Sequence, residues 1–181
     1  MMHMLRKPHA SAPAVAAARR ALSGLRPQPL AQDSDDAVVL AFADGASRGN
    51  PGKSGCGALL MDAATKRVLA AQALYLGERD TNNSAEYQGL LLALRLARSH
   101  DVTRVHVHMD SELVVRQMTG VYRVKAPHLR GLYAECQQLC GAFERVTFSH
   151  VRREANADAD RLANEAIDAH EQQQEKEESA Q

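Results

Sequence analysis

The segment from Val38 to Phe42 is a short, nearly continuous apolar run that stops at Ala43-Asp44-Gly45. Such a run is typical of a strand buried on both faces, as in a parallel or mixed sheet. An acid directly after a buried strand is costly unless it binds a cation or hydrogen-bond donors. The run therefore predicts a central strand that ends near Asp44. Residues 44–52 also suit a plain turn, because Asp, Gly, Asn and Pro are common in turns.

The rest of the chain alternates between strand-like and helix-like patterns. Four further segments have the pattern of strands: residues 55–61, 67–76, 102–109 and 145–151. Four others keep the helical period: residues 84–98, 111–118, 127–140 and 156–169. This order predicts an α/β fold with a five-stranded mixed sheet, three antiparallel strands followed by two parallel ones, flanked by helices. Functional residues in such sheets gather at the carboxyl ends of strands.

Composition divides the 181 residues into three parts. Residues 1–36 contain basic side chains but no acid before Asp33, and they end in a Pro-containing linker, so we expect a flexible basic arm. Residues 37–170 have the length of one folded domain. Residues 171–181 are acidic and Gln-rich, and we expect a disordered tail because they offer little apolar surface to bury.

Several classes of protein are disfavoured by simple counts. No apolar run approaches the roughly 20 residues that a membrane-spanning helix needs. The three cysteines are an odd number and favour a reducing compartment, so we expect a cytoplasmic protein. Cys136 and Cys140 lie one helical turn apart, but no second ligand pair completes a zinc site. The net charge of zero gives no indication of a polyanionic partner.

Three more acids fall at the ends of predicted elements, and each has an ordinary explanation. Glu86, in the opening turn of a helix, would interact well with the helix dipole. Asp110 could cap the helix that follows it. Asp160 lies in an Arg-rich stretch where charges are commonly solvated. No single carboxylate is decisive.

The four motifs together, in this order, resemble the type 1 ribonuclease H family. That family's pattern is a strand followed by D-G-[SA]-x-x-x-N-P-G, then T-N-N-x-A-E, D-S and N-x-x-A-D-x-L-A. This chain has the matching segments 44–52, 81–86, 110–111 and 156–163. The resemblance extends from about Ala37 to Ala169, and four ordered motifs are far more specific than one short match.

The resemblance implies a metal-dependent endonuclease that hydrolyses the RNA strand of RNA/DNA hybrids and leaves 3′-OH and 5′-phosphate ends. Its metal-binding carboxylates would be Asp44, Glu86, Asp110 and Asp160, with Asp158 a bystander. Two Mg²⁺ ions would be bound, with Mn²⁺ as a substitute, and Asp44 would bridge them. Mg²⁺ prefers oxygen ligands, and two such ions can activate water and neutralise a leaving oxygen. We expect a monomer whose partner is the hybrid.

The family's contacts to the 2′-OH imply a set of polar and backbone groups near the first two motifs: Gly45, Ser47, Asn50, Asn82 and Asn83. The family's usual loop histidine is absent, so Arg152 or Arg153 would supply positive charge instead. His150 falls inside a predicted strand, which favours a structural role.

The chain also departs from relatives that carry a Trp-rich basic protrusion, because it has no Trp. Basic side chains near the equivalent place could follow phosphates: Arg123, Lys125, His128 and Arg130. Two alternatives stay open, namely a catalytically silent nucleic-acid-binding protein and an enzyme of broader specificity on the same fold.

Overall fold

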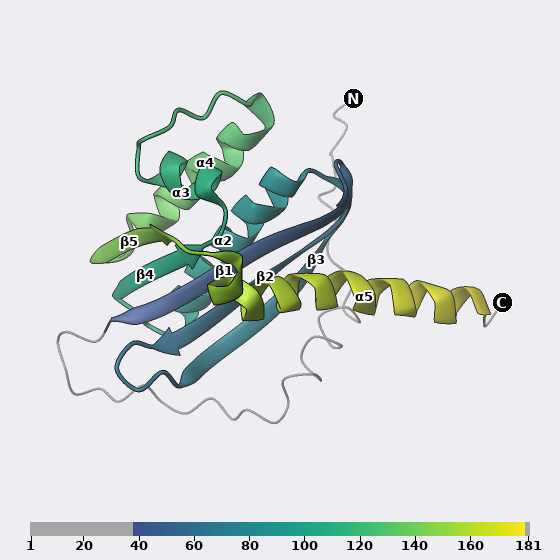
Figure 1. Ribbon diagram of the computed structural model, residues 1–181, viewed down its shortest axis with the longest axis horizontal. Helices are drawn as coiled ribbons and strands as arrows, with labels where there is room; N and C mark the ends of the chain where they lie inside the picture. The colour runs from purple at the N-terminus through teal and green to yellow at the C-terminus, as the bar shows by residue number, and fades with distance from the viewer. Residues whose placement is uncertain (1–37, 180–181) are drawn as a thin grey trace, which may run out of the picture.

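A computed structural model describes residues 38–179, and its centre is a five-stranded sheet (Figure 1). The strands are β1 (Val39–Gly49), β2 (Gly52–Asp62), β3 (Val68–Asp80), β4 (Arg104–Met109) and β5 (Arg145–His150). Their order is β3-β2-β1-β4-β5, with antiparallel pairing from β1 to β3 and parallel pairing of β4 with β1 and β5. The predicted fold class is confirmed.

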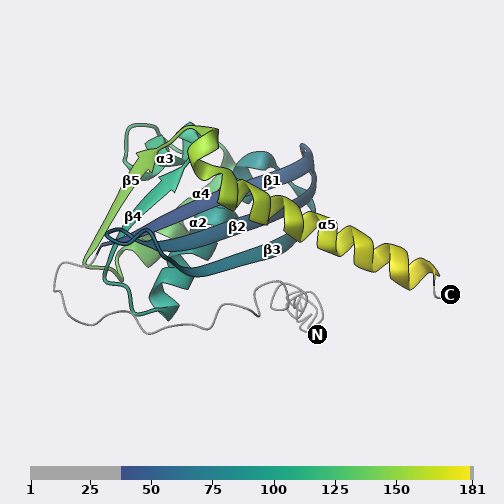
Figure 2. The same ribbon diagram turned by 60° about the horizontal axis from the view of Figure 1, so that its bottom comes forward.

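Helices cover both faces of this sheet (Figures 1 and 2). They are α2 (Asn82–Ser99), α3 (Glu112–Met118), α4 (Pro127–Cys140) and α5 (Ala157–Ser179), with the short 3-10 helix η1 (Arg153–Asn156) before α5. α2 packs on one face and α4 packs on α2, whereas α5 crosses the opposite face. Among residues 38–179, no helix combines the length and the apolar character needed to cross a bilayer.

The main core lies between the sheet and α2. Alternate residues of the two central strands point towards α2 and are buried, including Ala41, Val105 and Val107. They meet the apolar side of α2, where Leu90 and Leu94 are fully buried. α2 packs mainly on β1 and β2, which fixes it against the strand that carries Asp44.

β1 is longer than the sequence predicts, and the prediction that it ends near Asp44 is wrong. Its antiparallel pairing with β2 continues from Asp44↔Gly57 to Gly49↔Gly52. Its parallel pairing with β4 stops at Phe42↔His108. Asp44 therefore lies inside a strand, at the point where β1 has lost its parallel neighbour. The acid therefore follows the end of the parallel β1–β4 pairing, not the end of strand β1.

The prediction of a disordered tail is wrong for residues 171–179, because α5 continues to Ser179. Glu171 forms ion pairs with Arg48 and Lys53 of the β1–β2 hairpin, and His170 stacks on Tyr75 of β3. The Glu, Gln and Lys residues that follow are good helix formers, so a helix anchored here can continue into solvent. The predicted basic arm and residues 180–181 lie outside the described residues.

Candidate metal centre

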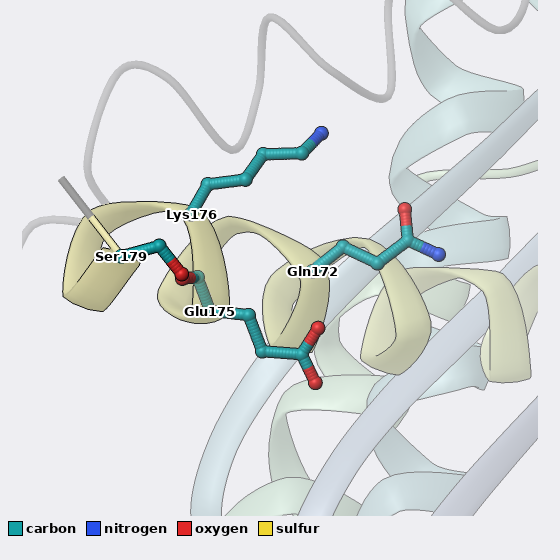
Figure 3. A pocket seen from close by; sticks show the side chains of 4 residues that line it. All are labelled: Gln172, Glu175, Lys176 and Ser179. Carbon is teal, nitrogen blue, oxygen red and sulfur yellow. The ribbon is translucent and has the colours of Figure 1, made fainter.

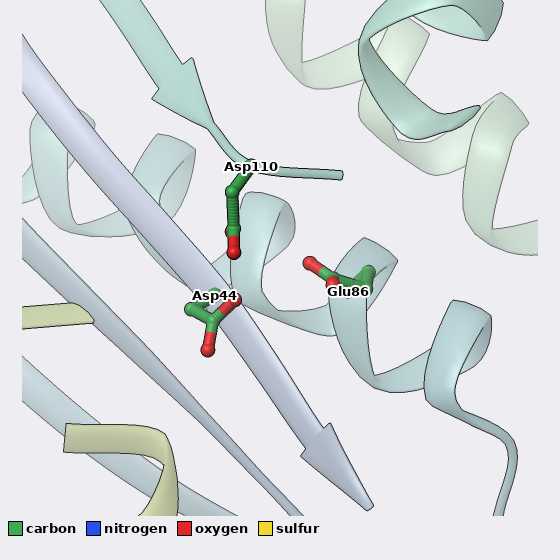
Figure 4. A group of neighbouring side chains, drawn as sticks. All are labelled: Asp44, Glu86 and Asp110. Atoms are coloured by element: carbon green, nitrogen blue, oxygen red, sulfur yellow. The ribbon is translucent and has the colours of Figure 1, made fainter. Parts of the chain in front are cut away.

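Three of the four predicted carboxylates meet at one place (Figure 4). Asp44 comes from β1, Glu86 from α2, and Asp110 from the residue directly after β4. One carboxylate oxygen from each lies within 4.8 Å of the others. We call these three residues the acidic cluster, and it is the one such group of potential metal ligands within residues 38–179.

Two glycines allow β1 and α2 to approach closely enough to form the cluster. A Cβ atom on Gly45 would lie 2.0 Å from the carbonyl carbon of Ala85. A Cβ atom on Gly89 would lie 2.4 Å from the backbone oxygen of Asp44. Real Cβ atoms do not tolerate such distances, so the backbones pack directly on each other. Gly45, predicted as a substrate contact, thus also has a packing role that places Asp44 beside Glu86.

The start of α2 is attached to the β1–β2 connection, which positions Glu86. Thr81 is the N-cap, because its hydroxyl accepts a hydrogen bond from the Ser84 amide at 3.1 Å. The Asn82 amide donates to the side-chain oxygen of Asn50 at 3.2 Å. Two of the predicted polar residues therefore contact each other and link the first two motifs.

Burial and mutual repulsion raise the pKa values of two carboxylates in the cluster. The side chain of Asp44 is 4% exposed, and burial, with the nearby charges of Asp110 and Asp160, raises its pKa to about 8. Burial and the charges of Asp44 and Asp110 raise the pKa of Glu86 to about 9. One oxygen of Glu86 is buried without a hydrogen-bond partner. A buried set of hard oxygen donors with an unsatisfied member fits a divalent cation.

Asp160 is the predicted ligand that the structure does not bring into the cluster. It lies in α5, and its Oδ1 accepts a hydrogen bond from Arg153 Nη2 at 2.7 Å. Its charge nevertheless contributes to the raised pKa of Asp44. Asp158, the predicted bystander, instead faces Arg161 at 3.6 Å on the exposed side of the helix. Arg153, but not Arg152, therefore contacts one of the predicted ligands in the described structure.

Ser47 and His150 both form hydrogen bonds to backbone oxygens. The Ser47 hydroxyl lies 2.6 and 3.1 Å from the backbone oxygens of Gly49 and Asp80 and shares its one hydrogen between them, so it links β1 to the end of β3. His150 is the last residue of β5, and its Nε2 donates to the backbone oxygen of Asp110 at 3.2 Å. This bond agrees with a structural role, although it places the ring beside the cluster.

A groove of about 450 Å³ lies between the start of α2, α3 and α4. Its lining is Asn83, Leu113, Gln117, Val121, Tyr122, Arg123, Lys125, Ala126 and Leu129. It combines two of the predicted phosphate contacts with exposed apolar surface, because Val121 and Tyr122 are 61% and 45% exposed. Asn83 connects this groove to the first turn of α2.

A second hollow of similar volume lies on the projecting half of α5 and is lined by Gln172, Glu175, Lys176 and Ser179 (Figure 3). It contains none of the predicted site residues. Cys136 is buried under the Tyr87 carbonyl, and burial raises the pKa of its thiol. Within residues 38–179, no cysteine belongs to a group of three potential metal ligands.

Sequence reasoning missed one residue of this site, Asn156. Its side chain is buried and donates to Asp110 Oδ1 at 2.8 Å and to the Ala43 backbone oxygen at 3.0 Å. The signal was its place four residues before Asp160 in the last motif. From the sequence alone, that position reads as the beginning of a helix.

The raised pKa values predict an unusual pH dependence for the metal-free protein. Between about pH 4 and pH 8 the folded state holds protons on Asp44 and Glu86 that the unfolded state has lost, so stability should fall as the pH rises. The slope is at most about 1.4 kcal/mol per pH unit for each proton. Thermal unfolding in EDTA at several pH values measures it, and Mg²⁺ should reduce it because the ion replaces the protons.

Glu86→Gln is the matched variant for this measurement, since it keeps the shape of the side chain and cannot lose a proton. It should be more stable than the parent protein in EDTA at about pH 8, and the difference should vanish near pH 4. Identical pH profiles for the two proteins would show that Glu86 does not titrate as proposed.

Comparisons of the sequence and the structure with known proteins agree on one family. A family model described as reverse transcriptase-like matches residues 42–166. The bifunctional protein Rv2228c of Mycobacterium tuberculosis is 47% identical over 131 residues, which are 72% of this chain and 36% of that protein. The chain thus spans about a third of the length of this relative.

Solved structures agree with both the fold and the family. RNase H1 from the halophilic archaeon Halobacterium salinarum has a TM-score of 0.70 at 37% identity, covering 73% of this chain and 98% of that one. LC11-RNase H1, solved in complex with an RNA/DNA hybrid, has a TM-score of 0.68 at 42% identity, covering 72% and 97%. The matched model, these likenesses and the shared sheet order show that the chain belongs to the type 1 ribonuclease H family.

Proposed function

We propose that this protein is a Mg²⁺-dependent endonuclease that hydrolyses the RNA strand of RNA/DNA hybrids and leaves 3′-OH and 5′-phosphate ends. The observation that carries the proposal is the acidic cluster: three carboxylates from three elements, largely buried and with one unsatisfied oxygen. Buried carboxylates without a cation among them repel one another and do not stabilise the fold. The similarity to an RNase H1 solved with a hybrid supports the substrate class.

We assign the four carboxylates to two ion positions. Asp44, Glu86 and Asp110 would hold one ion, and Asp44 with Asp160 would hold a second. Bound Mg²⁺ would lower the pKa of the attacking water and neutralise charge on the departing 3′ oxygen. All the protein donors are carboxylate oxygens, which suits Mg²⁺ and allows Mn²⁺ to replace it. For the second ion to bind, Arg153 must share or release Asp160.

Arg153 has a second part in the proposal. It is exposed at the start of η1 and holds a carboxylate of the predicted site, where many family members have a loop histidine. A guanidinium at this place would attract the scissile phosphate and help neutralise charge on the product.

Groups outside the acidic cluster would recognise the duplex. Gly45 adjoins Asp44, Asn82 and Asn83 open the helix that carries Glu86, and Asn50 bonds to Asn82. Their backbone and polar groups would contact the RNA strand through its 2′-OH groups. The neighbouring groove, with Arg123 and Lys125, would bind backbone phosphates. Phosphate contacts of this kind position a duplex without reading its sequence, and their strength falls with salt.

The test is cleavage of labelled RNA/DNA hybrid compared with duplex DNA, duplex RNA and single strands, each with Mg²⁺, Mn²⁺ or EDTA. Cleavage of the hybrid alone, only with metal, with 5′-phosphate on the released fragments, is the expected result. Binding without cleavage would favour the silent binding protein. Equal cleavage of all duplexes would favour the enzyme of broader specificity.

We also propose that the protein is a cytoplasmic monomer. The free, buried thiols of Cys56 and Cys136 suit a reducing compartment. Cell fractionation tests the location, and light scattering on the purified chain tests the oligomeric state.

A further inference from the structure

Asn156 is a buried amide with an unusual pair of partners. Its side chain is 1% exposed at the end of η1. The nitrogen Nδ2 donates one hydrogen to Asp110 Oδ1 and the other to the backbone oxygen of Ala43. Both partners are acceptors, so only the nitrogen can face them, and the orientation of the amide is determined.

The two bonds span a gap in the sheet. The parallel pairing of β1 with β4 ends at Phe42↔His108, so beyond this point the two strands no longer hold each other. Ala43 and Asp110 both lie past this last pair, and Ala43 directly precedes Asp44. One side chain from η1 therefore replaces the missing ladder between the two segments that carry Asp44 and Asp110.

We propose that Asn156 is a positioning residue for the metal centre: it fixes the rotation of the Asp110 carboxylate and its distance from Asp44. This inference rests on the proposed metal-dependent function. Hydrogen bonds to a ligand from outside the coordination shell orient it, and their loss commonly weakens metal affinity or activity by about 10–100-fold. Without Asn156, the Asp110 side chain would have to be ordered by the ion itself.

The test measures metal binding directly, by titration calorimetry with Mg²⁺ and by paramagnetic resonance of free Mn²⁺, on the full chain without nucleic acid. Asn156→Ala and Asn156→Ser should bind metal about 10–100-fold more weakly. The Mg²⁺ concentration that gives half-maximal hybrid cleavage should rise by the same factor, while KM for the hybrid stays unchanged. Asn164→Ala is the matched control, because Asn164 lies in α5 and its side chain donates to the backbone oxygen of Asp160 rather than to a carboxylate. This variant should bind metal normally.

A second arm asks whether Asn156 acts through Asp110. In an Asp110→Ala background, adding Asn156→Ala should change metal affinity by less than about twofold, since contacting residues are not additive. The proposal would be overturned if Asn156→Ala weakened metal binding by the same factor in the parent protein and in the Asp110→Ala background. Normal metal affinity in folded Asn156→Ala and Asn156→Ser would also overturn it. Failure of both single variants to fold with excess Mg²⁺ would assign Asn156 a purely structural role. Metal binding without hybrid cleavage in the parent protein would contradict the proposed function but leave this test intact.

Discussion

Replacing Asp44 by Asn is expected to reduce hybrid cleavage by at least about a thousandfold while making the metal-free protein more stable. Asp44 is the member of the cluster that both proposed ions would share. Losing several kcal/mol of transition-state stabilisation corresponds to that factor, at about 1.4 kcal/mol for each tenfold change. Stability should rise because Asn keeps the shape of Asp44 but removes the charge that burial and Asp110 disfavour.

Single-turnover cleavage at saturating Mg²⁺ and thermal unfolding in EDTA at about pH 8 measure the two effects. Asp158→Asn is the control. Asp158 lies two residues before Asp160 in the sequence, but its carboxylate is exposed and contacts Arg161 rather than the acidic cluster. It should retain normal cleavage and stability. Substantial activity in Asp44→Asn would remove Asp44 from the mechanism.

Gly45→Ala is expected to damage both the fold and the site. The added methyl group would overlap the backbone of Ala85, which cannot rotate away as a side chain can. Overpacking typically lowers the free energy of unfolding by about 1–3 kcal/mol. A clash with backbone should lower it by about 3 kcal/mol or more. At about 2–4 °C per kcal/mol for a protein of this size, the melting temperature should fall by roughly 6–12 °C.

Cleavage by the folded fraction of Gly45→Ala should also fall, because moving β1 away from α2 separates Asp44 from Glu86. Gly131→Ala is the matched control: Gly131 lies in α4 and nothing surrounds the position of an added Cβ within 4 Å. That variant should be stabilised by about 0.5–1 kcal/mol, since Ala favours helix. An unchanged melting temperature for Gly45→Ala would contradict the close packing of β1 on α2.

The sequence singled out Asp44, Glu86 and Asp110, which the structure brings together, but it misjudged the backbone that carries Asp44. A Gly, Asn and Pro content suited to a turn hid a strand that continues to Gly49, because local composition does not report pairing with β2. The error at residues 171–179 has the same origin, since the anchor of α5 on Arg48 and Tyr75 comes from distant strands. Asn156 was overlooked because its partners, Ala43 and Asp110, are remote in the chain.

The sequence by itself determined the order and type of the main elements, through apolar periodicity, and it singled out four candidate acids, through four ordered motifs. Only the tertiary structure decided which of these acids meet, that Asp160 bonds to Arg153, and that an amide joins the ends of two strands. The physical reason is that periodicity is a local property of the chain. The distances between carboxylates depend on where parallel pairing stops and on how closely β1 and α2 can pack at Gly45 and Gly89.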